Sequence, residues 1–238
     1  MKTLSIVALA IIALISWSRA ETVKVQKDKN NPVEVNKASF SGETFDFENY
    51  EAGELPQGWS QYVTGNGDEP DWKIVDDNGN KVLAQLSSAN PNYHFNDVVF
   101  DGLEATNVEL KVRLKGVEGK LDQGGGFIWR FTDKDNYYVV RANPLEDNVV
   151  LYKVEDGKRT DLPLVGKGKT YGVETAPLGH GWNNLKLIVE DNLFTIYLNG
   201  TELFKVEDDT FTGKGKVGLW TKADAVSYFD DFEVLVTD

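Results

Sequence analysis

The chain has 238 residues, and its 25 Lys and Arg against 38 Asp and Glu give a formal net charge of −13. This charge argues against nucleic acid or an anionic membrane surface as a partner. The chain has no cysteine and therefore no disulfide, and at this length a single core can form without one.

The first 20 residues predict a secretory signal peptide. One Lys precedes an apolar run from Leu4 to Trp17, and Ser18 and Ala20 stand at the −3 and −1 positions of a cleavage point. The run is too short to cross about 30 Å of hydrocarbon, although an uncleaved anchor helix is the alternative. Cleavage would leave a charge of −15, because the segment carries two basic residues and no acid. We therefore expect a secreted or periplasmic protein with no membrane contact after cleavage.

Residues 21–40 predict a flexible tether, because Lys, Asn and Asp dominate them and apolar residues are too sparse for a core. From residue 41 onward, apolar and polar residues alternate in short runs. Turn signals such as Asn78-Gly79, Asp156-Gly157 and Asn199-Gly200 separate these runs. No linker interrupts them, so residues 41–238 are expected to form one domain.

Two stretches show the alternation of β-strands clearly. Residues 107–116, NVELKVRLKG, turn their Val and Leu side chains to one face and Glu109, Lys111, Arg113 and Lys115 to the other. Residues 183–207 repeat this pattern as two successive hairpins, and no window after residue 20 has a convincing helical period. The sequence predicts an all-β fold of twelve to fourteen strands, arranged as an antiparallel two-sheet jelly-roll sandwich.

Several segments resemble a known group of folds. FDFENYEAGELPQGW at 45–59, the long run GGGFIWRFTDKDNYYVV at 124–140 and GKVGLWTKADAVSYFDDFEV at 215–234 are similar to concanavalin-A-like or laminin-G-like jelly rolls. The nearest subgroup is that of the 3-keto-disaccharide hydrolases, also described as family-16-like glycoside hydrolases. The resemblance covers residues 43–236 and implies a fold of the concanavalin-A-like lectin and glucanase type. It leaves lectins, sugar-binding modules, hydrolases and lyases open as functions.

The residues give little support to catalysis. Family-16 hydrolases carry the strand pattern Glu-x-Asp-x-Glu, and the nearest stretches, 46–48 and 231–233, each lack one acid. There is no Cys and no Gly-x-Ser-x-Gly turn, so a Ser-His-Asp arrangement would depend on His94 or His180. His180 lies in a Gly-flanked stretch typical of a loop. His94, in NPNYHFND, is the one weak catalytic candidate.

The central hairpin suggests a ligand-binding face. A four-residue loop at 133–136 would place Arg130, Tyr137 and Arg141 on one side of the sheet. Two planar donors and an aromatic ring suit sugar hydroxyls, a uronate and sugar C–H groups. Alternatively, the arginines pair with surface carboxylates, and a loop one residue longer would reverse the faces. Trp220 is the further candidate for a ligand contact.

The terminal strands suggest a metal site. FDFE at 45–48 and FDDFE at 229–233 are expected side by side at one sheet edge, as in related jelly rolls. Carboxylates that close repel one another, and a Ca²⁺ ion with six to eight oxygen ligands would remove the penalty. Asp230, Asp46 and Glu48 are the candidate ligands. The alternative is that these acids face solvent or pair with Lys.

These observations predict a secreted jelly-roll domain, expected as a monomer, that binds an oligosaccharide or polysaccharide on its concave face. Calcium is the one cofactor that the sequence suggests. A glycan-active hydrolase or lyase of the 3-keto-disaccharide hydrolase type is the second hypothesis, favoured by the resemblance and allowed by His94. A structural or adhesive module is the third.

Overall fold

The computed structural model describes residues 42–238, which form sixteen strands. Residues 1–41 lie outside the described part of the chain. They include the expected signal peptide (1–20) and the expected tether (21–40). Within the described part of the chain, no helix is long and apolar enough to cross a membrane.

The strands form two eight-stranded antiparallel sheets, sheet A and sheet B. Sheet A has the order β14-β13-β12-β6-β16-β4-β3, with β1 also paired to β16. Its members are β1 (Glu43–Phe45), β3 (Trp72–Asp76), β4 (Lys81–Gln85), β6 (Val108–Glu118), β12 (Asn183–Glu190), β13 (Leu193–Leu198), β14 (Thr201–Glu207) and β16 (Val226–Val236).

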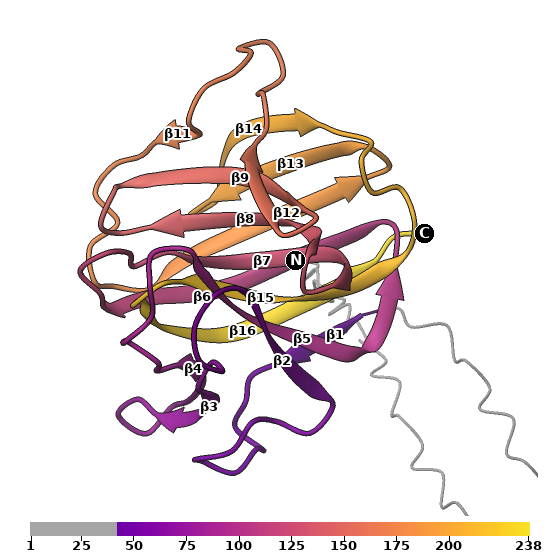
Figure 1. Ribbon diagram of the computed structural model, residues 1–238. Coiled ribbons are helices and arrows are strands. Elements are labelled where there is room, and N and C mark those ends of the chain that lie inside the picture. Colours follow the sequence, from indigo (N-terminus) through magenta and orange to yellow (C-terminus); the bar gives the residue numbers. More distant parts are fainter. Residues whose placement is uncertain (1–41) are drawn as a thin grey trace, which may run out of the picture. The chain divides into compact units, whose positions relative to one another are not determined.

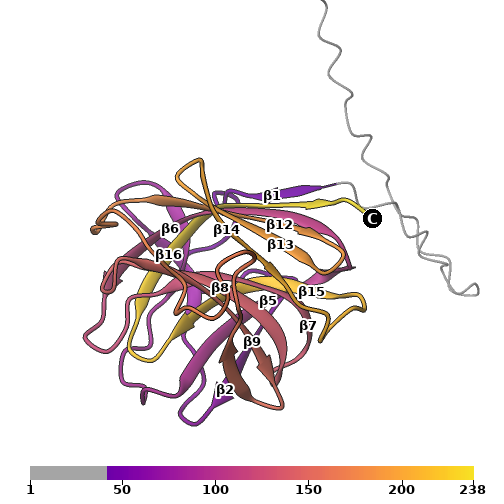
Figure 2. The same ribbon diagram turned by 90° about the horizontal axis from the view of Figure 1, so that it is seen from above.

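Sheet B has the order β10-β9-β8-β7-β15-β5-β2, with β11 paired to β9. Its members are β2 (Trp59–Gly65), β5 (His94–Ala105), β7 (Gly125–Asp133), β8 (Asn136–Asn143), β9 (Asn148–Glu155), β10 (Lys158–Asp161), β11 (Val173–Glu174) and β15 (Gly215–Lys222). The two sheets lie as separate layers (Figures 1 and 2). The predicted all-β, antiparallel two-sheet jelly-roll sandwich is confirmed.

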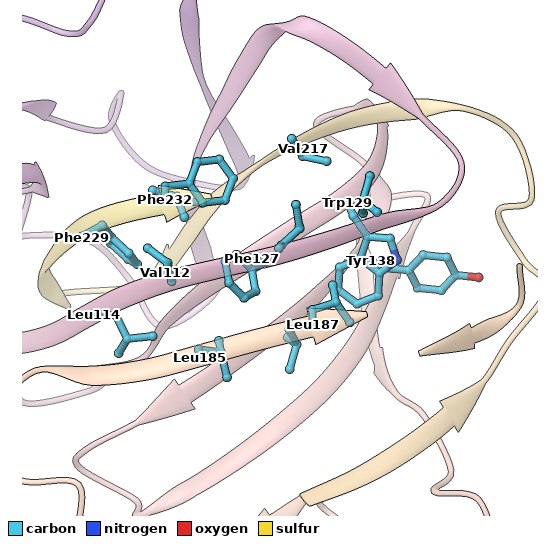
Figure 3. Close-up of a cluster of buried hydrophobic side chains, with 14 of the residues drawn as sticks. Val112, Leu114, Phe127, Trp129, Tyr138, Leu185, Leu187, Val217, Phe229 and Phe232 are labelled. Atoms are coloured by element: carbon cyan, nitrogen blue, oxygen red, sulfur yellow. The ribbon is translucent and has the colours of Figure 1, made fainter. Parts of the chain in front are cut away.

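The main core fills the space between the sheets, and the alternation in the sequence explains it. Val112 and Leu114 on β6 and Leu187 on β12 point from sheet A toward Phe127 and Trp129 on β7 of sheet B (Figure 3). All five side chains are at most 2% exposed. Burial of these apolar side chains on both inner faces is the main force that holds the sheets together.

Sheet B curls strongly. Thr64 on its edge strand β2 is hydrogen-bonded to Tyr137 on β8 with 2.8 Å between the hydroxyl oxygens, although β5, β15 and β7 separate these strands in the sheet. In Figure 2, β2 and β9 both turn away from sheet A. The concave face inside this curl holds a second buried cluster, made of Phe95, Val99, Ile128, Phe131, Tyr137, Val139, Val150, Tyr152, Val154 and Trp220.

Two side chains cover the second cluster. The Tyr93 hydroxyl accepts a hydrogen bond from the backbone N–H of Arg159 and donates one to the carbonyl of Gly157, both at 2.9 Å. The Arg159 guanidinium lies over the rings of Phe95 at 5.4 Å and Tyr152 at 4.4 Å. The residues before β5 and the β9–β10 hairpin thus meet across the concave face, which is filled by the protein's own side chains.

The β7–β8 hairpin differs from the expected register. The expected four-residue loop at 133–136 would oppose Trp129 to Val140. Instead Trp129 pairs with Tyr138, and the turn between Asp133 and Asn136 contains two residues. An irregularity between Trp129 and Asp133 absorbs the difference, and Arg130 within it adopts a φ of +49°. A bulge of this kind re-aims side chains, so Arg130 leaves the face that Tyr137 and Arg141 share.

The terminal strands lie side by side, as expected, since Phe45 on β1 pairs with Phe232 on β16. Among the described strands β1 has no other partner and so lies at a sheet edge, as expected, whereas β16 is internal because β6 pairs along one side of it and β4 and β1 along the other. Across β6 the pairing passes from Asp230–Arg113 to Glu233–Lys111, so β16 carries an extra residue there. Asp231 has a φ of +48°, as a residue in a bulge can.

Candidate functional site

The side chains expected to contact a ligand are buried. Arg130 and Arg141 are 2% exposed, and Tyr137 and Trp220 are fully buried. Tyr137 and Trp220 belong to the second cluster inside the curl of sheet B. The expectation of an open face lined by these four residues is therefore corrected: the sequence showed the strands, but neither the curl of sheet B nor the bulge that moves Arg130.

Arg141 makes contacts within the protein. Its Nη1 donates to the side chain of Asn148, and its Nη2 donates to Glu146 Oε2 at 2.7 Å and to the hydroxyls of Tyr152 and Tyr171 at 3.3 Å. The planar guanidinium thus connects β8, β9 and the connection that precedes β11. Its donors hold the fold together and do not face an open cleft.

Arg130 lies in a different place. Its guanidinium donates to the carbonyls of Thr106, Asp191 and Phe211, and its charge lies 5.7 Å from the Phe194 ring. Because of the bulge, it holds the turns at one end of the sandwich. It does not join Arg141 in a common site.

His94, the weak catalytic candidate, is fully buried. Its Nδ1 lies 2.9 Å from the carbonyl of Asn66 and its Nε2 lies 2.8 Å from Asn96 Oδ1. Gly67 packs so closely that a Cβ there would come within 2.3 Å of Nδ1. With both ring nitrogens engaged and no access to solvent, His94 has a structural role. His180 lies in an exposed turn, as expected.

The acids proposed as calcium ligands each have protein donors. Asp230 Oδ2 accepts from Asn80 at 3.0 Å and from Arg113 at 3.3 Å. Glu48 accepts from the backbone N–H of Lys81 at 3.0 Å, and Asp46 accepts from the N–H of Glu48 at 3.2 Å. Among residues 42–238, no three His, Cys, Asp or Glu side chains form a group that could hold a metal ion. Arg113 supplies a counter-charge to Asp230 from within the protein.

Calcium binding by this protein stays a prediction from the sequence. Melting curves recorded with and without a chelator test it, because a ligand that binds only the folded state raises the melting temperature. A lower midpoint in the chelator that Asp230→Asn abolishes would support a site at Asp230. An identical midpoint would contradict it.

An open depression lies on the outer face of sheet A. It is a groove of about 610 Å³ that runs from β16 across β6 and β12 to β13. We call it the sheet A groove. The side chains that line it and alternate outward along these strands are Lys111, Arg113, Asn184, Lys186, Tyr197, Asp231 and Glu233.

The cations of the sheet A groove are paired with carboxylates. Lys111 lies 3.1 Å from both Glu109 and Glu233, and Lys186 lies 3.0 Å from Glu109. Hydrogen bonds to Glu233 and Glu109 raise the pKa of Lys111. Burial raises the pKa of Glu109, but hydrogen bonds from Lys186 and Lys111 outweigh it and leave that pKa below its ordinary value. Lys111 and Glu109 therefore stay charged at neutral pH.

Arg113 is one of the side chains that line the sheet A groove. Its Nη1 donates to Asp230 Oδ2 at 3.3 Å and to Asp231 Oδ2 at 3.0 Å. In the part of the chain that the structure describes, neither Nε nor Nη2 makes a hydrogen bond, and the same holds for the side-chain amide of exposed Asn184, which faces Arg113 in the β6–β12 register. A guanidinium edge and a carboxamide are thus available to a ligand.

Aromatic rings accompany these polar groups. Tyr197 lies in the groove with the ammonium of Lys186 5.4 Å from its ring centre, and its hydroxyl donates to Glu202 at 3.1 Å. Trp182, which directly precedes β12, is half-buried, with Arg113 and Lys115 each 4.9 Å from its ring centre. The outer face of sheet A therefore combines aromatic surface with fixed polar groups.

A smaller groove of about 290 Å³ adjoins the sheet A groove. It shares Lys111 and Glu233 with it and extends toward β1, where Glu43 and Thr44 are exposed. We call it the β1 groove. The two depressions together form one continuous surface that crosses five strands of sheet A.

No protein-family model and no curated protein matches the sequence. Solved structures match the fold. The carbohydrate-binding module CBM66 from Bacillus subtilis matches with a TM-score of 0.54 at 17% identity, over 74% of this chain and 94% of that one. Cellulose induced protein, Cip1, matches with a TM-score of 0.56 at 13% identity, over 82% of this chain and 97% of that one.

The GH43 protein BlXynB from Bacillus licheniformis also matches, with a TM-score of 0.53 at 16% identity. The match covers 87% of this chain but 41% of that protein, so it concerns only a part of BlXynB. At these identities the likeness establishes the fold: the chain is a jelly-roll β-sandwich of the kind found in a carbohydrate-binding module. The matches do not single out the 3-keto-disaccharide hydrolase subgroup.

Proposed function

We propose that the protein binds carbohydrate in the sheet A groove. The observation that carries this proposal is the groove itself, in which unused donors of Arg113 and Asn184 lie beside the ring of Tyr197. Sugar recognition uses planar hydrogen-bonding groups for hydroxyls and aromatic surface for C–H groups. The fold it shares with a module named for carbohydrate binding supports the same function by analogy.

The sequence predicted that the sugar binds on the concave face, which in the structure is the inside of the curl of sheet B. A ligand there would have to displace Tyr93 and Arg159 before it could reach Tyr137 or Trp220. The sheet A groove needs no such rearrangement. We therefore place the proposed site on the outer face of sheet A.

We propose binding without turnover. Every carboxylate that lines the sheet A groove is ion-paired with Lys or Arg, whereas hydrolysis of a glycosidic bond needs one carboxyl that can hold a proton at the scissile bond. The second hypothesis, a hydrolase or lyase, was favoured by the resemblance and allowed by His94, but His94 is buried with both ring nitrogens hydrogen-bonded. Secretion, or export to a periplasm, is proposed from the predicted signal peptide.

Substitutions in the groove test the proposal. We expect Asn184→Ala and Tyr197→Ala each to weaken binding of a glycan about tenfold, since a lost hydrogen bond or stacked ring is worth about 1.4 kcal/mol. Both side chains lie on the surface, so the melting temperature should change little. Titration calorimetry against a panel of soluble polysaccharides measures the affinities.

Two comparisons sharpen this test. Tyr197→Phe keeps the ring and should retain most of the affinity if stacking dominates. Lys73→Ala removes a half-buried cation on β3, outside both grooves, and should leave binding unchanged. Parent-like affinity in both alanine variants would place the site elsewhere.

A further inference from the structure

We infer that the ligand of the sheet A groove is an uncharged glycan chain that extends over the β1 groove as well. This inference rests on the proposed function and adds two properties of the ligand, its charge and its length. Each property follows from a separate feature of the outer face of sheet A.

The charge of the ligand follows from the ion pairs. The three cations of the groove, Lys111, Arg113 and Lys186, face the four carboxylates Glu109, Asp230, Asp231 and Glu233 at 3.0 to 3.3 Å. The three cations and four carboxylates sum to a formal charge of −1. A uronate or sulfate that accepted from the free edge of Arg113 would lie beside Asp231 and Glu233 and would be repelled by them. The formal charge of −13 on the whole chain adds a longer-range repulsion. A polyanionic glycan is therefore disfavoured.

The remaining polar groups suit hydroxyls. A sugar hydroxyl both donates and accepts, so it can use the free guanidinium edge of Arg113, the carboxamide of Asn184 and the outer oxygens of Asp231 and Glu233 without displacing any ion pair. The side chains of Asp231 and Glu233 are 43% and 45% exposed, which leaves them accessible as acceptors. Fixed carboxylates that accept from hydroxyls also discriminate against anionic sugars.

The length of the ligand follows from the two adjoining depressions. The sheet A groove has a volume of about 610 Å³ and the β1 groove one of about 290 Å³, and both are lined by Lys111 and Glu233. A ligand can therefore extend from one groove into the other past these two side chains. A monosaccharide would occupy only part of this surface. A chain of several sugar units would contact both grooves.

The test uses defined oligosaccharides and the full-length secreted chain. Cello-, xylo- and manno-oligosaccharides of one to six units serve as uncharged probes, and oligogalacturonates of the same lengths serve as anionic probes. We expect at least one uncharged series to bind, with an affinity that rises with length and then levels off. Binding should be nearly independent of salt, because no net ion pairing is formed.

A blocking variant separates the grooves. Thr44→Trp places a bulky ring in the β1 groove, and Thr44 is exposed, so the fold should tolerate it. We expect the longest probe that binds to lose about tenfold in affinity while the shortest is unaffected. Thr160→Trp, at an exposed position on β10 of sheet B, is the matched control and should bind like the parent.

The outcomes distinguish a failure of carbohydrate binding in the sheet A groove from a failure of the uncharged, extended ligand. If none of the probes binds and the Asn184 and Tyr197 substitutions change nothing against a wider panel, the proposed function itself is wrong. If the oligogalacturonates bind best, or if salt weakens binding strongly, carbohydrate binding stands and the uncharged ligand is wrong. If affinity does not depend on length and Thr44→Trp binds like the parent, the ligand does not extend into the β1 groove.

Discussion

Arg141→Ala is expected to lower the free energy of unfolding by about 3 kcal/mol. The guanidinium is 2% exposed and donates to Asn148, Glu146, Tyr152 and Tyr171, so its loss leaves buried acceptors unpaired and opens a cavity. The hypothesis of an exposed arginine would have predicted an unchanged melt. Urea unfolding of the variant and the parent measures the difference.

Arg141→Lys provides the comparison. Lysine keeps the positive charge near Glu146 but cannot donate in several directions within one plane. Its unfolding free energy should therefore fall between those of the parent and the alanine variant. A urea midpoint for Arg141→Ala equal to that of the parent would show that the side chain does not connect these strands.

Asp97→Asn is expected to raise the stability of the protein at neutral pH by about 2 kcal/mol, because it removes a buried carboxylate that has no cation beside it. Asp97 is fully buried, and burial raises the pKa of its carboxyl well above the ordinary value, with hydrogen bonds from Thr64 and Tyr137 offsetting only part of the effect. The hydroxyls of Thr64 and Tyr137 have two hydrogens between them. Four close contacts share these hydrogens: two with the Asp97 oxygens, one with the Lys134 carbonyl and one between the two hydroxyls. A proton on Asp97 would add a third hydrogen.

The sign of the pH dependence follows from this pKa. Between about pH 4, the ordinary pKa of Asp, and the raised pKa of the folded state, the folded protein binds more protons than the unfolded chain. The contribution of Asp97 to stability therefore declines as the pH rises through this window. Urea midpoints measured across it should fall more steeply for the parent than for Asp97→Asn.

Asp101→Asn is the control with the opposite sign. Burial raises the pKa of Asp101, but hydrogen bonds from Lys216 and Ser60 outweigh it and hold that pKa below its ordinary value. Asp101 thus contributes stability above the ordinary pKa and loses it as the pH falls. Parallel pH profiles for the parent and Asp97→Asn would show that Asp97 carries its charge in the folded state at no cost.

The fold could be predicted because its determinants are local. The alternation along β6 placed Val112 and Leu114 in the core, as observed. The Asn199-Gly200 signal marked a turn, and both residues adopt the positive φ, 49° and 82°, that a two-residue hairpin turn requires. Such patterns depend only on neighbouring residues in the chain.

The hairpin register could not be predicted in the same way. The irregularity after Trp129 depends on Arg130 taking a left-handed conformation, which non-glycine residues adopt rarely. Nothing in the residue types at 129–133 signals it. Two extra residues in β7 relative to β8 were enough to move Arg130 from the expected face to the end of the sandwich.

The proposed site was visible only in part. The alternation in the sequence predicted that Lys111 and Arg113 point outward on β6, and the structure confirms this. It could not show that β12, some seventy residues later, pairs with β6 and brings Asn184 opposite Arg113. The cover over sheet B depends on Tyr93 and Arg159, also far apart in the chain. Sites made by distant strands need the pairing of those strands to be known.

The curl of sheet B has a consequence for how copies of this chain behave together. An open sheet offers two rows of free backbone groups at its outermost strands, where another chain could add a strand and begin an aggregate. Here the Thr64 hydroxyl on β2, one outermost strand, donates to the Lys134 carbonyl in the turn between β7 and β8. On β10, the other outermost strand, the Arg159 N–H donates to the hydroxyl of Tyr93, which directly precedes β5. Sheet B thus directs the ends of its outermost strands toward itself, which limits strand addition at high concentration.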